Sequence, residues 1–242
     1  MRYKCICAYD GTLFHGFQVQ KGLRTVQEEI EAVLLIIHKK KIRIHASGRT
    51  DAGVHALNQV FHFDSDLELA PEKMKNAINS RLPRDIHIKK VEIVDKSFHS
   101  RFSAKAKEYH YLLDYGSYDP LKRNYRYYCP YRDVDWEKFK EALLVFEGVH
   151  DFRSFTKNQK LKNTVRYIKK IEVESKETLL TVKFIGEGFM HNMVRIMVAM
   201  ALEVGRGKIT IADLKAIMAQ KDRRLSPKIV PPSGLYLYCV YY

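Results

Sequence analysis

The chain is poor in features that mark secreted, zinc-binding and membrane proteins. It has only four cysteines, Cys5, Cys7, Cys129 and Cys239, and they form no CxxC pair and no zinc-finger spacing with histidine. We therefore expect small buried or half-buried thiols in a reducing compartment. No run of about 18 apolar residues occurs, and the opening "MRYKCICAYDG" lacks the apolar core of a signal peptide. These absences predict a cytoplasmic protein that is neither secreted nor membrane-spanning.

The motifs of common cofactor enzymes are also missing. The chain has no GxxxxGK[ST] phosphate loop, no HExxH helix, and no HxE followed by PCxxC. The fragments "GEG" and "GRGK" are too short to count as nucleotide-binding fingerprints. We therefore predict chemistry that needs neither a metal nor a cofactor.

Acidic residues are scarce relative to basic ones. The chain has 42 Lys and Arg against 28 Asp and Glu, a formal net charge of +14. Such a field favours polyanions, of which nucleic acid is the commonest in a cytoplasm. Any single basic cluster fits a solvated surface as well as a nucleic-acid-binding surface. Only the clusters taken together indicate binding of nucleic acid. The clusters cover residues 38–43, 105–111, 121–128, 157–170 and 221–224, and several carry tyrosines that can stack on bases.

The first hundred residues show an α+β pattern. "YKCICAYDG" alternates and ends at a turn, which predicts a strand. "TVQEEIEAVLLIIHKK" predicts a helix, because Thr25 and Glu28 fit a capping box and apolar residues recur on one face: Ile30, Val33, Leu34 and Ile37. A strand over "NQVFHFD", a helix opened by Pro71 and a strand over "DIHIKKVEIV" follow.

The rest of the chain repeats this outline. "AKEYHYLLDY" predicts a strand and "DWEKFKEALLVFEG" a helix ending at Gly148. Two strands follow in "VRYIKKIEVE" and "LLTVKFIGEG", then an apolar helix in "MHNMVRIMVAMALEVG", a short helix around "IADLKAIMA", and a buried strand in "GLYLYCVYY". We predict two α+β halves, 1–105 and 106–242, that pack side by side around a cleft suited to a ligand.

The run "HASGRTDAGVHALNQ", residues 45–59, carries the strongest candidates for chemistry. Gly48 and Gly53 disfavour both helix and strand and predict a loop. Asp51 is a candidate nucleophile or base, because a carboxylate beside cations stays ionised and can attack an electrophilic carbon. Helix capping or an Asx turn is the structural alternative.

Two neighbours of Asp51 extend the candidate site. Arg49 can pair with Asp51, bind a phosphate, or occupy the gap left by an extruded base. His55 fits a general base, although a histidine at the start of a strand also fits a structural hydrogen-bonding role. The residues alone leave these alternatives open.

The motifs together resemble those of the tRNA pseudouridine synthase A family. "GRTDAGVHA" looks like the family's signature loop. The family's other blocks recur in its order and spacing: "YDGTLFHGFQVQ", "TVQEEIE", "NSRLPRDI", "FHSRFSAKAKEYHY", "HDFRSF", "GEGFMHNMVRIMVAMALEVG" and "GLYLYCVYY". The likeness covers essentially the whole chain.

The resemblance implies both an activity and a fold. The activity is conversion of uridine to pseudouridine in the anticodon stem-loop of tRNA, at three neighbouring positions on its 3′ side, without cofactor or metal. The fold is the pseudouridine synthase fold, with two RRM-like α+β halves around a mixed, mainly antiparallel sheet and a central cleft. The family usually works as a homodimer whose subunits jointly cradle the tRNA.

The resemblance also assigns roles to individual residues. Asp51 matches the catalytic aspartate, Arg49 an essential arginine, Tyr109 in "KEYHY" the active-site tyrosine, and Arg195 in "NMVR" the basic partner of the aspartate. We also assign Arg101, in "FHSRFSAK", and His55 to substrate binding. The guanidinium of Arg195 lies on an otherwise apolar helix, so it needs a partner, for which Asp51 is the obvious carboxylate.

The mechanism begins with base flipping, because a stacked uridine must leave its helix before its glycosidic bond can be broken. Asp51 then attacks C1′ or removes the 2′-proton on a glycal route, and the sequence does not decide between these two. A non-catalytic RNA-binding module and a synthase acting on ribosomal RNA are the competing hypotheses. A non-catalytic RNA-binding module gives no reason for a carboxylate among cations, because a carboxylate repels phosphate.

Overall fold

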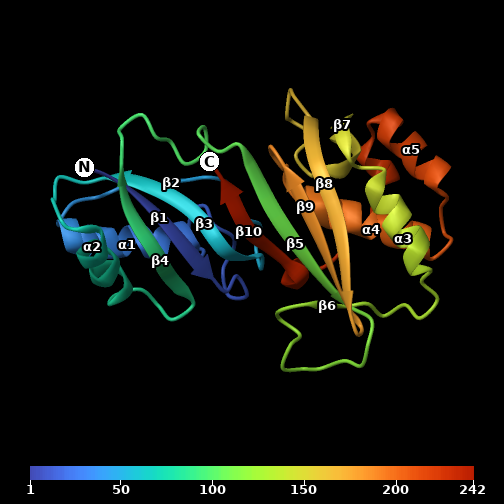
Figure 1. Ribbon diagram of the computed structural model, residues 1–242, viewed down its shortest axis with the longest axis horizontal. Helices are drawn as coiled ribbons and strands as arrows, with labels where there is room; N and C mark the ends of the chain where they lie inside the picture. Colours follow the sequence, from blue (N-terminus) through green and yellow to red (C-terminus); the bar gives the residue numbers. More distant parts are fainter. The chain divides into compact units, whose positions relative to one another are not determined.

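The computed structural model describes residues 1–242, which form two compact units (Figure 1). Unit 1 comprises Met1–Lys105 together with Tyr236–Tyr242, and unit 2 comprises Ala106–Leu235. The predicted halves, 1–105 and 106–242, placed the C-terminal strand in the second half, whereas here it groups with unit 1. The strand belongs to unit 1 because its backbone pairs in parallel with the strand that follows the Asp51 loop, Tyr236 opposite His55.

Unit 1 is a mainly antiparallel sheet with two helices on one face (Figure 1). Its strand order is β4-β1-β3-β10, and β2 pairs with β3. β1 runs antiparallel to both β3 and β4, whereas β10 is parallel to β3. The elements are β1 (Arg2–Tyr9), α1 (Val26–His38), β2 (His45–Ala46), β3 (His55–Asp64), α2 (Pro71–Asn79), β4 (Ile86–Val94) and β10 (Leu235–Tyr241).

The predicted patterns explain why the elements of unit 1 form. Every second residue of β1 is buried, as its alternation predicts. The Thr25 side chain accepts a hydrogen bond from the Glu28 backbone N–H at 3.4 Å and so caps α1. That helix buries one apolar stripe against the sheet: Val26, Ile30, Val33 and Leu34.

Unit 2 is built on antiparallel strands with helices gathered on one side (Figure 1). Its strand order is β5-β9-β8-β7, and the short β6 pairs in parallel with β5. The elements are β5 (Ala106–Asp114), β6 (Tyr127–Tyr128), α3 (Trp136–Leu144), β7 (Gly148–Asp151), η1 (Arg153–Phe155), β8 (Val165–Lys176), β9 (Leu179–Gly186), α4 (Met193–Gly205), α5 (Ile211–Gln220), η2 (Arg223–Leu225) and η3 (Pro232–Gly234).

Helix α4 forms the centre of unit 2. Every residue of this helix is buried except Arg195 and Glu203. A helix that is apolar on all sides is a core helix, so its position is fixed by packing against its neighbours. Its last residue lies against the start of α3, since an added Cβ at Gly205 would lie 3.0 Å from the carbonyl oxygen of Asp135, the residue that caps α3.

The structure confirms the predicted α+β pattern and corrects one helix boundary. The predicted helix up to Gly148 instead ends at Leu144, and Gly148 opens β7 with a φ of +98°. The sequence analysis missed β2, β6 and β7, because strands of two to four residues are too short to show alternation.

The cysteines fit the expectation of small interior thiols. All four are free, and Cys5, Cys7 and Cys129 are buried. Burial raises the pKa of the Cys5 and Cys7 thiols, which keeps them protonated and unreactive.

No helix of the structure combines the length and the apolar character that crossing a membrane requires.

Candidate active site

The loop between β2 and β3, which carries Arg49 and Asp51, is tied to the segment that follows β1. The Phe17 backbone N–H donates to the Thr50 carbonyl at 3.1 Å, and the Gly53 N–H donates to the Phe14 carbonyl at 3.2 Å. These bonds fix the loop backbone on both sides of Asp51.

Glycines allow these two segments to approach so closely. At Gly16, which has a φ of +91°, an added Cβ would lie 2.8 Å from the Thr50 carbonyl oxygen. At Gly11 an added Cβ would lie only 2.1 Å from the Val54 carbonyl oxygen. No other residue fits at such contacts without moving the backbone. Of the two glycines that predicted the loop, Gly53 has a positive φ of +74°.

A network of buried polar side chains joins the same loop to β1 and β3. The Tyr9 hydroxyl and Thr50 Oγ1 are 2.8 Å apart. Ser47 Oγ donates to Gln59 Oε1 at 2.7 Å, and Gln59 Nε2 donates to the Gly48 carbonyl at 3.0 Å. The sequence analysis missed this network. Its signal was Gln59, an amide next to the apolar residues Val60 and Phe61 of a predicted strand.

His55 begins β3 and is 2% exposed. The Gly11 N–H donates to His55 Nδ1 at 3.0 Å. Asp10 Oδ1 lies 3.2 Å from the same nitrogen, and the Tyr236 ring stacks on the imidazole at 4.7 Å. In this geometry the imidazole holds the "YDGT" turn against the start of β3, which fits its structural alternative.

The loop presents its two candidate side chains differently. Asp51 is half-buried, whereas Arg49 is exposed. A half-buried carboxylate on a fixed backbone suits chemistry at one atom of a substrate. An exposed guanidinium suits contact with a phosphate or with the space vacated by a flipped base.

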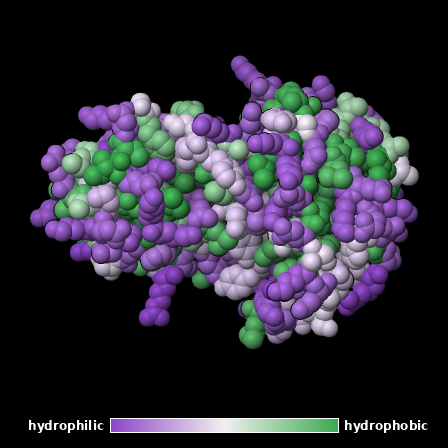
Figure 2. Space-filling view, viewed as in Figure 1, coloured by the Kyte–Doolittle hydropathy of each residue, from purple (hydrophilic) through white to green (hydrophobic).

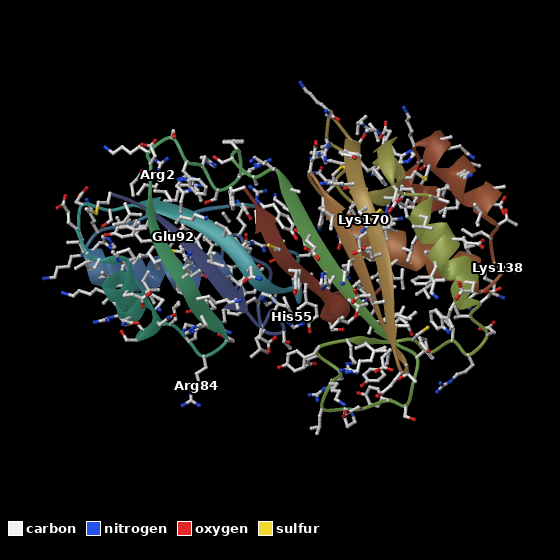
Figure 3. The ribbon with its side chains drawn as sticks, viewed as in Figure 1. Arg2, His55, Arg84, Glu92, Lys138 and Lys170 are labelled. Atoms are coloured by element: carbon white, nitrogen blue, oxygen red, sulfur yellow. The ribbon has the colours of Figure 1, made fainter.

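Arg101 lies at the other end of the unit 1 sheet. Its neighbour Ser100 donates its backbone N–H to His62 Nδ1 at 3.2 Å, near the end of β3. His55 marks the start of that strand, beside the Asp51 loop. At about 3.3 Å per residue the two ends of this stretch are about 23 Å apart. Figure 3 labels His55 and Arg2 at different ends of unit 1, and the Arg2 guanidinium donates to the Phe98 carbonyl at 2.8 Å, close to Arg101 in the sequence.

Tyr109 lies on β5 in unit 2, with only 7% of its surface exposed. Its ring meets that of Phe189 edge-on, with centroids 4.9 Å apart and planes at 70°. Phe184 is its partner across the pair of strands β5 and β9. The ring is therefore held by aromatic packing in a fixed orientation.

Arg195 is one of the two residues of α4 that are not buried. Its Nη1 donates to Asn192 Oδ1 at 2.7 Å, and its Nε donates to the Val230 carbonyl at 2.8 Å. These two acceptors are neutral, so they orient the guanidinium without cancelling its charge. The segment before α4 thus contacts both candidates of unit 2, through Phe189 for Tyr109 and through Asn192 for Arg195.

Comparison with known proteins identifies the family. A profile described as tRNA pseudouridine synthase matches residues 6–103 and 142–242. The chain belongs to this family. It is 50% identical to the tRNA pseudouridine synthase A of Geobacillus sp. (strain WCH70), over 100% of this chain and 98% of that protein. It is 43% identical to the protein of the same name from Bacillus subtilis (strain 168), over 100% and 99%. The predicted pseudouridine synthase fold is therefore confirmed.

A chain in a crystal structure of a Cbf5-Nop10-Gar1 complex has a TM-score of 0.36 and 16% identity, covering 74% of this chain and 41% of that one. No conclusion rests on this likeness. Within the pseudouridine synthase family, the profile covers Asp51, Arg49, His55, Arg101 and Arg195 of this chain, whereas Tyr109 falls in the stretch between its two matched ranges.

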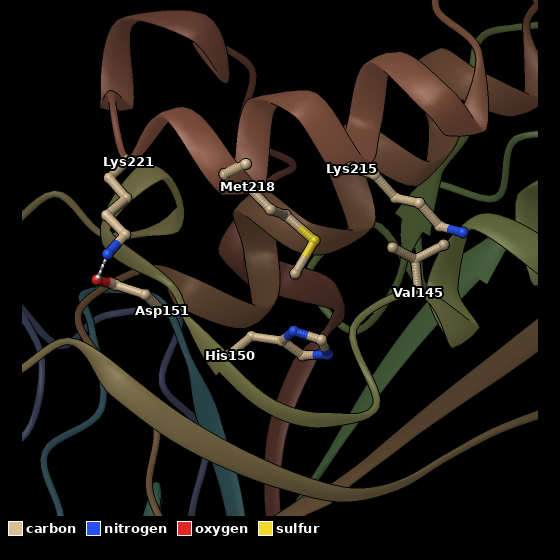
Figure 4. Close-up of a pocket in the computed structure, with 7 residues that line it drawn as sticks. Val145, His150, Asp151, Lys215, Met218 and Lys221 are labelled. Carbon is tan, nitrogen blue, oxygen red and sulfur yellow. Dashed lines mark ion pairs between the residues drawn. The ribbon is translucent and has the colours of Figure 1, made fainter.

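A pocket of about 380 Å³ in unit 2 contains none of these candidates (Figure 4). Its lining includes Met218 and Val145 as well as His150, and Lys221 Nζ pairs with Asp151 at 3.2 Å.

Proposed function

We propose that this synthase converts uridine to pseudouridine in tRNA, at three neighbouring positions on the 3′ side of the anticodon stem-loop. The observation that carries the proposal is the loop "GRTDAGVHA". It holds Asp51 on a backbone fixed by hydrogen bonds, in a chain 43–50% identical to proteins named tRNA pseudouridine synthase A. The formal charge of +14 supports binding of a polyanion. Figure 2 shows that hydrophilic side chains cover much of the face in view.

The reaction rearranges one nucleotide without gain or loss of atoms overall. The bond between N1 and C1′ breaks, the uracil turns while it is held, and a bond between C5 and C1′ forms as the C5 proton leaves and N1 gains a proton. The ionised carboxylate of Asp51 begins this sequence, either as the nucleophile at C1′ or as the base for the 2′-proton. Arg49 stabilises the flipped-out nucleotide.

We further propose that residues of both units act on the same uridine. Tyr109 stacks on the uracil, and Arg195 supplies the positive charge that keeps Asp51 ionised. His55 and Arg101 belong to substrate binding, His55 by holding the loop and Arg101 by contacting RNA away from the reacting nucleotide. The half-buried guanidinium of Arg195, oriented by two neutral acceptors, supports this assignment.

Tritium release from tRNA carrying [5-³H]uridine tests the activity. We expect the wild type to release tritium and Asp51→Asn to release none above background, because the amide lacks the charge for attack or proton removal. The variant should bind tRNA as the wild type does. The matched control is Asp66→Asn, which neutralises a surface aspartate paired with Lys40 and should leave turnover unchanged. Release by Asp51→Asn would contradict the assignment.

A mapping experiment separates this proposal from its competitors. Pseudouridines are mapped in tRNA and ribosomal RNA from cells that lack the gene, and again after complementation with wild type or Asp51→Asn. The proposal is supported if pseudouridines disappear from the anticodon stem-loop of tRNA and if only the wild type restores them. Loss confined to ribosomal RNA indicates a paralogue, and no loss in either RNA indicates a binding module.

A double-mutant cycle tests the proposed pair of Asp51 and Arg195. Arg195→Met and Asp51→Ala each leave the partner's charge without its counter-charge. Each should lower the free energy of unfolding by about 3 to 5 kcal/mol if the pair is buried in the folded protein. The double variant should recover part of this loss in urea unfolding. Additivity within about 0.3 kcal/mol would remove Arg195 from the site.

The family resemblance also supports two further proposals, on the oligomeric state and the location of the protein. We propose that the protein acts as a homodimer in the cytoplasm, where its tRNA substrate is found. Sedimentation of the purified protein over a range of concentrations, with and without tRNA, tests the dimer. A single species of monomer mass at all concentrations would contradict it.

A further inference from the structure

Phe102 is the most exposed aromatic side chain of the molecule, with 77% of its surface accessible. It lies in the turn between β4 and β5, in unit 1. A single exposed apolar residue needs no explanation by itself. What distinguishes Phe102 is that its ring belongs to an ordered group of planar side chains.

His99 lies directly behind the phenyl ring. The two ring centroids are 4.4 Å apart with planes at 34°, and the Arg101 guanidinium lies 5.8 Å from the centre of the same phenyl ring. The buried ring of His62 meets His99 edge-on at 4.7 Å, and the exposed ring of His45 lies tilted at 5.7 Å from His99 and stacks on His62. The Phe102 ring is therefore the outermost member of a group that reaches into the sheet.

The turn that carries Phe102 has a fixed backbone. His99 Nδ1 accepts the backbone N–H groups of Arg101 at 3.1 Å and Phe102 at 3.4 Å. Ser103 closes the turn, since its N–H donates to the His99 carbonyl at 2.8 Å. The Tyr242 hydroxyl donates to the Ser100 carbonyl at 2.8 Å and ties the turn to the C-terminus of the chain. Little conformational entropy remains to be lost when a ligand stacks on this ring.

The charge around the ring suits a phosphate backbone. From Lys96 to Lys105 the chain has three basic residues and no acidic one. Asp64, on the neighbouring strand, forms an ion pair with Arg2 at 2.8 Å, so its charge is balanced. An aromatic face beside an arginine is the combination that single-stranded RNA recognition uses.

We propose that Phe102 stacks on an unpaired nucleobase of the tRNA substrate and that Arg101 binds the adjacent phosphate, near the end of β3 opposite to the one that begins beside the Asp51 loop. The inference rests on the proposed function, because it takes tRNA as the ligand. It adds a second contact that no part of the catalytic loop provides. This contact selects RNA by the position of an unpaired base relative to the target uridine.

Steady-state kinetics with a tRNA transcript that the wild type converts test the proposal. Phe102→Leu keeps an apolar side chain but removes the aromatic face, and should raise KM about tenfold while kcat at saturation stays unchanged. Phe102→Trp should match or improve on the wild type. The matched control is Ile36→Ser, which alters a side chain 62% exposed on α1 and should change neither constant. An unchanged KM in Phe102→Leu overturns the proposal.

A fluorescence measurement keeps the test independent of turnover. The chain has one tryptophan, Trp136, so Phe102→Trp combined with Trp136→Phe leaves a single reporter on the turn. Binding of tRNA should quench its emission and protect it from acrylamide. Bound tRNA with an unprotected reporter contradicts stacking. Sedimentation of Phe102→Leu tests whether a second copy of the chain, rather than RNA, covers this ring. A weakened dimer with unchanged tRNA affinity would show that it does, and would overturn the proposal.

These outcomes are distinct from failure of the proposed function. If the wild type converts no uridine in any tRNA, the function fails before Phe102 is tested. If the wild type converts tRNA and Phe102→Leu behaves identically, the function stands and only the stacking contact is wrong.

Discussion

The two units hold their proposed catalytic side chains by different means. In unit 1, Asp51 lies on a loop whose backbone is positioned by a few directional hydrogen bonds, including the contact of Tyr9 with Thr50. In unit 2, Arg195 extends from a helix that is buried on nearly all sides. A hydrogen-bonded loop depends on single polar atoms, whereas a packed helix depends on many non-directional contacts. One lost atom should therefore affect turnover in unit 1, and lost volume should affect stability in unit 2.

The largest effect that tests this contrast is expected at Phe146 in unit 2. Its ring is fully buried and packs against Phe155 and Phe152 at centroid distances of 5.0 and 6.3 Å. Phe146→Ala should lower the free energy of unfolding by about 3 to 5 kcal/mol, because it leaves a cavity. Urea unfolding followed by the fluorescence of Trp136, which packs on Phe139 in the same unit, measures this loss.

Turnover per folded molecule should not change in Phe146→Ala. The matched control is Leu144→Ala, a truncation of a side chain that is 52% exposed at the end of α3, which should stay within about 0.5 kcal/mol of wild type. A large fall in kcat at full folding would show that packing in unit 2 also sets catalytic geometry, and the contrast between the units would fail.

The sequence predicts the packed part of the molecule better than the hydrogen-bonded part. The alternation of β1 and the apolar run of α4 are local patterns, and both elements form where they are predicted. Gly148 misled the prediction because a glycine marks the end of a helix and the start of a strand equally well. The parallel pairing of Tyr236 with His55 joins residues far apart in the chain, which no local pattern encodes.

The residues of the candidate site also differ in how well the sequence predicted them. Asp51 and Arg49 were recognisable because their loop has a distinctive sequence, "GRTDAGVHA". The support from Tyr9 and Gln59 was not, since both are buried on strands among mainly apolar side chains. A buried amide needs partners wherever it occurs, so the sequence indicates that a network exists but not which backbone groups complete it.

Tyr9→Phe should have the next largest effect and should act on turnover rather than stability. Removal of the hydroxyl leaves Thr50 Oγ1 without this partner, one residue from Asp51, at a cost of about 1 kcal/mol in stability. A small displacement of the carboxylate should lower kcat about tenfold to a hundredfold. Single-turnover tritium release measures the chemical step directly.

Tyr3→Phe is the matched control for this substitution. Its hydroxyl is also removed from β1, but it donates to the Leu69 carbonyl at 2.7 Å, away from the loop. We expect a similar loss of stability with unchanged kcat. Equal loss of turnover in both variants would mean that Tyr9 acts through the general stability of the sheet, and the hydrogen-bonded loop would lose its special role.

The smallest effect concerns the histidines of unit 1 and appears as a dependence of stability on pH. Burial first, and then the charges of His99, Arg2 and His45, lower the pKa of His62 to about 4. The unfolded chain has the ordinary histidine pKa of about 6.5, so above that pH both states are neutral and the stability is complete. As the pH falls from about 6.5 towards 4, His62 binds a proton in the unfolded state but not in the folded state. The free energy of unfolding therefore decreases.

The expected loss between pH 6.5 and 5.5 is about 1 kcal/mol for this one group. His62→Gln should flatten the curve over that interval, since it keeps a polar acceptor near the Ser100 N–H but cannot titrate. The control His87→Gln, at an exposed position on β4, should leave the curve parallel to that of the wild type. Urea unfolding by circular dichroism at half-unit steps measures all three proteins. Parallel curves for wild type and His62→Gln would show that His62 is protonated equally in both states, and that unit 1 tolerates a charge inside its sheet.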